Sequence, residues 1–351
     1  MLLSRADAEL GAREPDLPLA EPPLGRQRLC LPGGSAEPLV SPRALLDALT
    51  EPLVERFRPL LPVGYAAGAE AYRRAVATLG AEELSTHYTD GLAFFRDTFV
   101  PYLKETLTAL SGGAWSLDEY EAYAAGSDVD FITHLVEAIA AREPVCLYPG
   151  DWYGFQVGCT QLEGIRWTDD SRGRFACLCI PSVRNGHLTA EMLEFLDGAS
   201  GCLLNINLFP TLAPEERRAV ATALAPVLPK SVISVSFSRG FGLTASQLGV
   251  ALVHRDHPLR RRFETPWAWH TYFYNAIAAR AFMAIDLPRL AAVDAQRREW
   301  VAAWLAERGL PRVASGSYYV KSFRLDGDVP DRLRPLARDG LARLCFKPPQ
   351  I

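Results

Sequence analysis

The chain has 351 residues, of which 49% are hydrophobic, with a formal net charge of −4 and a pI near 5.9. This length is enough for one large domain with a smaller companion. The near-balanced charge argues against a nucleic-acid-binding surface and a polybasic membrane surface. No apolar run approaches the length of a membrane span, and the first residues lack a signal-peptide core. We therefore expect a cytoplasmic protein with neither nucleic acid nor membrane as a partner.

The seven cysteines are scattered along the chain, and several lie in apolar, strand-like runs. This pattern is typical of buried free thiols in a reducing compartment. Cys177 and Cys179 would project to one face of a strand, but no histidine or second cysteine pair stands at ligand spacing. We predict no metal site.

Residues 1–40 are rich in proline, glycine and acids and form a predicted irregular N-terminal arm. From 41 to 110, apolar residues three and four apart predict helices. After a glycine break, helices and buried strands alternate. The predicted helices are 128–141, 189–196 and 214–227, and the predicted strands are 145–148, 175–180, 202–208, 231–237 and 247–254. This alternation predicts an α/β fold with a mostly parallel sheet covered by helices on both faces.

A long helical stretch, 272–308, comes next, and the chain ends in strand-like segments with a predicted helix near 330–341. These elements predict a small α+β C-terminal domain. We place an arm at 1–40, a large α/β domain at 41–285 and the small domain at 286–351.

In a parallel α/β sheet, ligands bind at the carboxyl ends of the strands. Gly126 and Ser127 open a predicted helix there, and free N–H groups with a hydroxyl suit a phosphate, although the pair is also a common helix cap. About 25 residues later, Trp152 could stack on a planar ring or simply pack in the core.

Two further strand ends carry polar residues. Ser236, Ser238 and Arg239 follow one strand and precede a glycine-rich turn, and Asn205 lies 34 residues before Arg239. Near the C-terminus, Arg343 stands in the sequence Ala-Arg-Leu-Cys-Phe. Together these segments resemble the fold-type I pyridoxal-phosphate (PLP) superfamily, of the class I/II aminotransferase kind, over roughly residues 115–346. The resemblance implies that Gly126, Ser127, Trp152, Ser236 and Ser238 line a cofactor site, and that Arg343 clamps a substrate carboxylate.

The departures from this family concern the cofactor. Arg239 replaces the lysine that forms the Schiff base, and a guanidinium stays protonated and is a poor nucleophile. Asn205 replaces the aspartate that keeps the pyridine nitrogen protonated. Gln247 and Val183 replace the anchors of the cofactor phosphate and ring hydroxyl. Lys230, one of only four lysines, precedes the strand and should lie at the opposite end of the sheet.

We therefore expect an aminotransferase-like homodimer, repurposed in biosynthesis, that binds a small amino-acid-like carboxylate without covalent PLP. Arg343 would hold the carboxylate and Arg239 a phosphate or second carboxylate. His270 is the best remaining acid/base candidate by residue type, although a histidine among aromatics is often only packed. Two alternatives stay open. One is a non-catalytic partner of an active PLP enzyme, and the other is a protein that holds PLP or pyridoxamine phosphate (PMP) noncovalently.

Overall fold

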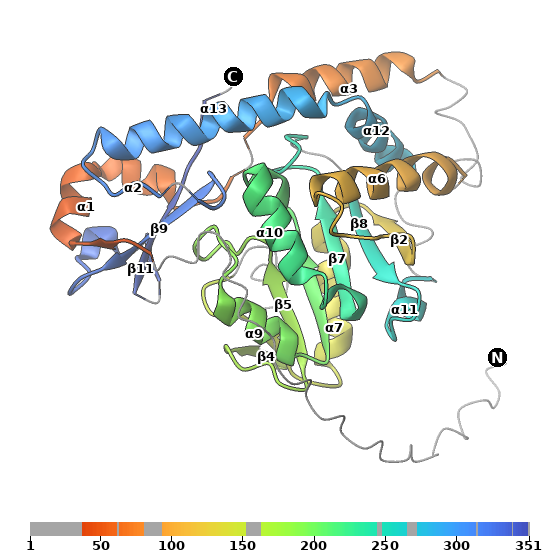
Figure 1. The fold of residues 1–351 in the computed structure, drawn as a ribbon, viewed down its shortest axis with the longest axis horizontal. Helices are drawn as coiled ribbons and strands as arrows, with labels where there is room; N and C mark the ends of the chain where they lie inside the picture. The colour runs from red at the N-terminus through yellow and green to blue at the C-terminus, as the bar shows by residue number, and fades with distance from the viewer. Residues whose placement is uncertain are drawn as a thin grey trace, which may run out of the picture.

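The structure is a computed structural model that describes residues 37–61, 63–80, 93–151, 163–243, 248–264, 272–313, 315–338 and 340–349. These residues form a seven-stranded and a four-stranded sheet, with helices packed around both (Figure 1). The predicted α/β class is confirmed.

The seven-stranded sheet has the order β2-β8-β7-β6-β5-β3-β4, and every strand in it is parallel to the others except β8. Its strands are β2 (Tyr120–Ala125), β3 (Val145–Leu147), β4 (Ile165–Trp167), β5 (Phe175–Cys179), β6 (Gly201–Asn205), β7 (Ser231–Ser236) and β8 (Gly249–His254). The mostly parallel sheet is confirmed, while β2 and β4 are strands that we did not predict. The predicted strand 202–208 ends at Asn205, and a turn follows.

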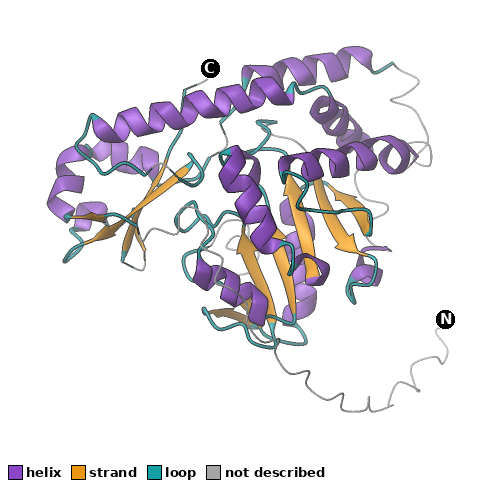
Figure 2. Cartoon of the chain, viewed as in Figure 1, coloured by secondary structure: helices purple, strands orange, loops and turns teal. Residues whose placement is uncertain are grey.

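Helices cover both faces of this sheet (Figure 2). One face packs against α6 (Val100–Leu110), α9 (Ala190–Gly198), α10 (Pro214–Leu224) and α12 (Tyr272–Met283), and the other against α7 (Asp128–Ala140). α7 buries Phe131, Leu135 and Ile139 because residues about four apart share one helix face. It begins at Ser127, whose side chain accepts a hydrogen bond from the Asp130 backbone N–H.

The smaller sheet has the order β1-β9-β11-β10. Its strands are β1 (Leu39–Val40), β9 (Val320–Leu325), β10 (Ala337–Arg338) and β11 (Leu341–Cys345). The long helix α13 (Leu287–Ala306) runs past both sheets (Figure 1). The remaining elements are α1 (Pro42–Ala48), α2 (Glu51–Phe57), α3 (Ala66–Thr78), η1 (Phe95–Phe99), η2 (Phe209–Thr211), η3 (Leu228–Lys230), α11 (Arg260–Glu264) and η4 (Asp331–Leu333).

The predicted helix near 330–341 is wrong. That segment forms the short 3-10 turn η4 and then β10. Pro335 accounts for this, because proline lacks an N–H and clashes inside a helix. Helices α1 and α2, which we assigned to the large domain, contact η4, and α2 also contacts β11 of the smaller sheet. The domain boundaries themselves stay a prediction.

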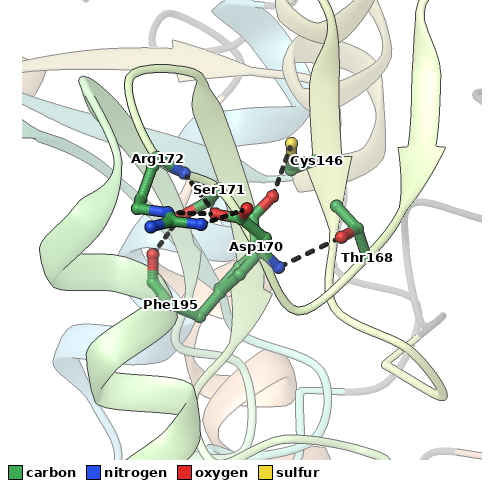
Figure 3. A network of polar contacts seen from close by, with 6 residues as sticks. All are labelled: Cys146, Thr168, Asp170, Ser171, Arg172 and Phe195. Carbon is green, nitrogen blue, oxygen red and sulfur yellow. Dashed lines mark hydrogen bonds and ion pairs between the residues drawn. The ribbon is translucent and has the colours of Figure 1, made fainter.

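The loop from β4 to β5 is fixed by its own polar contacts. Figure 3 shows the Asp170 carboxylate accepting from Arg172, while the Asp170 backbone N–H donates to the Thr168 hydroxyl. The Ser171 hydroxyl donates to the Phe195 carbonyl at α9. This network orders the loop and ties it to α9.

Five of the cysteines lie in the described residues, and all five are buried free thiols, as predicted: Cys146, Cys177, Cys179, Cys202 and Cys345. Within the described ranges, no group of three or more potential ligands could hold a metal ion. None of the described helices is long and apolar enough to cross a membrane.

Candidate functional site

Polar side chains meet at the carboxyl ends of β5, β6 and β7. Cys179, Asn205 and Ser234 stand side by side in register on these three strands. The start of α7 approaches the same edge, because Gly249 lets the two backbones meet. A Cβ atom at Gly249 would lie 2.2 Å from the Asp128 nitrogen. The fold therefore brings Ser127 close to the strand ends, as the resemblance implied.

Arg239 follows β7 and is 5% exposed. Its Nη2 donates a hydrogen bond of 2.9 Å to the carbonyl oxygen of Leu60. The guanidinium thus binds the main chain of a segment almost 180 residues earlier. A lysine amine is shorter and lacks the planar fork, so this contact suits arginine at the position.

Asn205 ends β6, and both atoms of its amide have partners. Nδ2 donates to the Asp128 carboxylate at 3.3 Å, and Oδ1 accepts from the Asn207 backbone N–H at 3.0 Å. Burial raises the pKa of Asp128, while the Arg239 charge and the Asn205 hydrogen bond lower it in part. Sequence reasoning missed Asp128, although it directly follows Ser127 in the segment that we singled out.

Asp151 is a second buried carboxylate that sequence reasoning missed, one residue before Trp152. It accepts from the Cys179 backbone N–H at 2.6 Å, and from the Ser182 hydroxyl and the Val183 N–H at 2.9 Å each. Burial raises its pKa to about 6, although these donors oppose the shift. Asp151 therefore fixes the loop that follows β5.

Arg343 lies on β11 and is 6% exposed. Its Nη1 donates to the Val183 carbonyl at 3.2 Å. The N–H of the same Val183, in the loop that follows β5, donates to Asp151. Val183 therefore connects Arg343 of the smaller sheet to the strand ends of the larger sheet. Val183 itself is a buried apolar side chain that offers no hydrogen bond to a ligand.

Ser236 and Ser238 face each other, with hydroxyl oxygens 3.2 Å apart. The Ser127 hydroxyl caps α7. Lys230 donates from Nζ to the carbonyls of Asp197 and Ala199, which precede β6, so it lies at the opposite end of the sheet as predicted. Trp152, Gln247 and His270 lie outside the described residues, and their roles stay predictions.

The structure resembles solved aminotransferases. A histidinol-phosphate aminotransferase from Clostridium acetobutylicum aligns over 83% of this chain and 94% of its own, with a TM-score of 0.56 and 10% identity. The Sinorhizobium meliloti histidinol-phosphate aminotransferase, in complex with pyridoxal-5'-phosphate, aligns over 82% of this chain and 84% of its own, with a TM-score of 0.53 and 14% identity. An aromatic-amino-acid aminotransferase from Burkholderia pseudomallei, covalently bound to pyridoxal phosphate, aligns over 75% of this chain and 77% of its own, with a TM-score of 0.50 and 14% identity.

No protein-family profile matches the chain, and no curated protein matches its sequence. At these identities the structural likeness establishes an aminotransferase-like fold.

The described residues do not fit a lysine-bound pyridoxal phosphate. Arg239 stands where the resemblance implies the lysine, and its guanidinium binds Leu60. The Asn205 amide is neutral, so it offers no charge to a ring nitrogen, and it is already bound to Asp128 and to Asn207. Lys321 has a buried amine with a pKa lowered by burial to about 8, but it donates to the Ser315 carbonyl in the segment before β9.

Proposed function

We propose that this protein binds a small amino-acid-like carboxylate at the carboxyl ends of β5, β6 and β7, without a covalent cofactor. It would act as a homodimer in a biosynthetic role. One observation carries the proposal: Arg239, which the resemblance assigns to the position of the Schiff-base lysine, is buried and hydrogen-bonded to the Leu60 carbonyl. A buried arginine at this position suits the binding of a negatively charged ligand group, and it does not suit Schiff-base formation by a lysine amine.

The charges around the site suit a zwitterion. Arg343 would bind the ligand carboxylate, because a charged acceptor forms a stronger hydrogen bond than the Val183 carbonyl that Arg343 now contacts. The buried Asp128 carboxylate would attract the ligand ammonium group. Burial raises the pKa of this carboxyl, and an incoming positive charge would favour its ionised form and so oppose the effect of burial.

Calorimetric titration tests this proposal. The panel is a set of L-amino acids, their 2-oxo acids, and the amines that lack the carboxylate. We expect the carboxylates to bind and the amines to bind at least about tenfold more weakly, since each 1.4 kcal/mol is a factor of ten. Arg343→Gln should abolish this preference, while Arg334→Gln, on a side chain that is 74% exposed, should leave it unchanged. Absence of binding by every carboxylate would refute the proposal.

As an alternative ligand, PLP or PMP would bind noncovalently through the Ser127, Ser236 and Ser238 hydroxyls. Denaturation after incubation with PLP and borohydride tests this, because a noncovalent cofactor is then released unmodified and leaves no pyridoxyl group on the chain.

A second candidate is a non-catalytic partner of an active PLP enzyme. The mutual pairing of Asn205 with Asp128 favours it, because these two groups are satisfied without a ligand. Null titrations, together with altered kinetics of an active aminotransferase on mixing, would support this reading over the first.

A further inference from the structure

Asn207 lies at the carboxyl end of β6 and is 2% exposed. Its backbone N–H donates to Asn205, and its carbonyl lies against Gly240, where an added Cβ would be 2.8 Å away. Asn207 is thus placed between the Asn205–Asp128 pair and the turn that carries Arg239.

The Asn207 side-chain amide is buried without a hydrogen-bond partner in the described part of the chain, at both Nδ2 and Oδ1. The Ser234 hydroxyl, in register beside Asn205, is likewise buried and unpartnered there. Buried polar groups of native proteins are almost always satisfied, and an unmade hydrogen bond is costly. Asn207 follows β6 and Ser234 lies in the neighbouring strand β7, so two such side chains near this edge of the sheet point to a bound polar group.

We infer that Asn207 is a specificity residue that pairs with a carboxamide of the bound ligand. This inference rests on the proposed function, in which Arg343 holds the ligand carboxylate. A side-chain amide presents a donor and an acceptor in one plane. A carboxamide complements both, whereas a carboxylate offers only acceptors and an ammonium only donors. The ligand class is therefore an amino acid or related acid that carries a primary amide.

The test uses L-glutamine, L-glutamate and L-methionine as probes of similar size with the wild-type protein and Asn207→Leu. We expect the wild type to bind glutamine at least about tenfold more tightly than the other two, because a site built for hydrogen bonds rejects analogues that lack them. Asn207→Leu should lose this discrimination while still binding the three probes through Arg343. Asn207→Ala covers the case in which leucine does not fit.

Asn185 provides the matched control. It is also 2% exposed, but its Nδ2 donates to Glu37 at 3.1 Å and its Oδ1 accepts from the His187 N–H at 2.9 Å. Without ligand, Asn207→Leu should keep or raise the Tm, whereas Asn185→Leu should lower it. A Tm loss for Asn207→Leu equal to that for Asn185→Leu would overturn the inference.

The binding outcomes separate the two proposals. Equal binding of all three probes, unchanged in Asn207→Leu, would refute the role of Asn207 and leave the carboxylate site standing. Binding of none of them by the wild type, together with the null result for the wider panel, would refute both.

Discussion

Replacing Asn205 with aspartate would restore the residue that the aminotransferase resemblance implies at this position. In this protein, however, it would place a second carboxylate beside Asp128, because the two side chains are in contact at 3.3 Å. We therefore predict that Asn205→Asp destabilises the fold.

The magnitude follows from the geometry. The lost hydrogen bond to a charged acceptor is worth about 1.5–3 kcal/mol. Two unit charges 3.3 Å apart repel by roughly 5 kcal/mol at an effective dielectric constant of about 20. The pair limits this repulsion by taking up a proton, whose cost is about 1.36 kcal/mol per pH unit above the pKa. We expect a loss of about 1.5–5 kcal/mol at pH 7, between the value of the lost hydrogen bond alone and that of the full repulsion.

Urea unfolding at pH 5 and pH 7 measures this loss. It should be smaller at pH 5, because a carboxyl with a raised folded-state pKa loses stability as the pH rises through that pKa. Exchanging the two residues, in Asp128→Asn with Asn205→Asp, restores an amide–carboxylate pair and should recover most of the loss. A stable single variant, or a double variant with the sum of both single losses, would show that the two side chains do not interact.

Three further predictions concern the site and the assembly. Arg239→Lys should not restore efficient single-turnover transamination, and it should lower the free energy of unfolding by about 1.5–3 kcal/mol because the Leu60 contact is lost. Adding Asn205→Asp and Gln247→Arg should raise the transamination rate more than additively. Rapid turnover by the single variant would contradict this. Burial raises the Asp151 pKa from 3.8 to about 6, so its ionisation should lower the stability of the fold by about 3 kcal/mol as the pH rises from about 4 to 7. The stability of Asp151→Asn relative to wild type should therefore rise by that amount over the same pH range. A stability difference that does not change with pH would rule the pKa shift out. Light scattering at micromolar concentration should show a homodimer, and a monomer alone would count against it.

The sequence predicted the sheet well because its strands are continuous apolar runs. The start of α7 was equally predictable, since Ser127 is a strong helix cap. β4 was missed because it has only three residues, two of them exposed. The helix predicted near 330–341 is wrong because the segment contains Pro335, which a helix interior does not accommodate.

The candidate site was only partly predictable. Arg239, Asn205 and Arg343 could be singled out because the resemblance gives each of them a counterpart in the aminotransferase pattern. Their partners could not be identified, because the Leu60 carbonyl lies 179 residues from Arg239 and the Val183 carbonyl 160 residues from Arg343. Main-chain acceptors at such separations leave no signal in the residue types.

Borohydride reduction in the presence of excess PLP, followed by peptide mass mapping, tests most directly the claim that this fold works without a Schiff base. The chain has four lysines: Lys104, Lys230, Lys321 and Lys347. We predict no stoichiometric pyridoxyl adduct on any of them and no protein-bound visible absorbance band before reduction. A stoichiometric adduct on one lysine, lost when that lysine is replaced by methionine, would contradict the account.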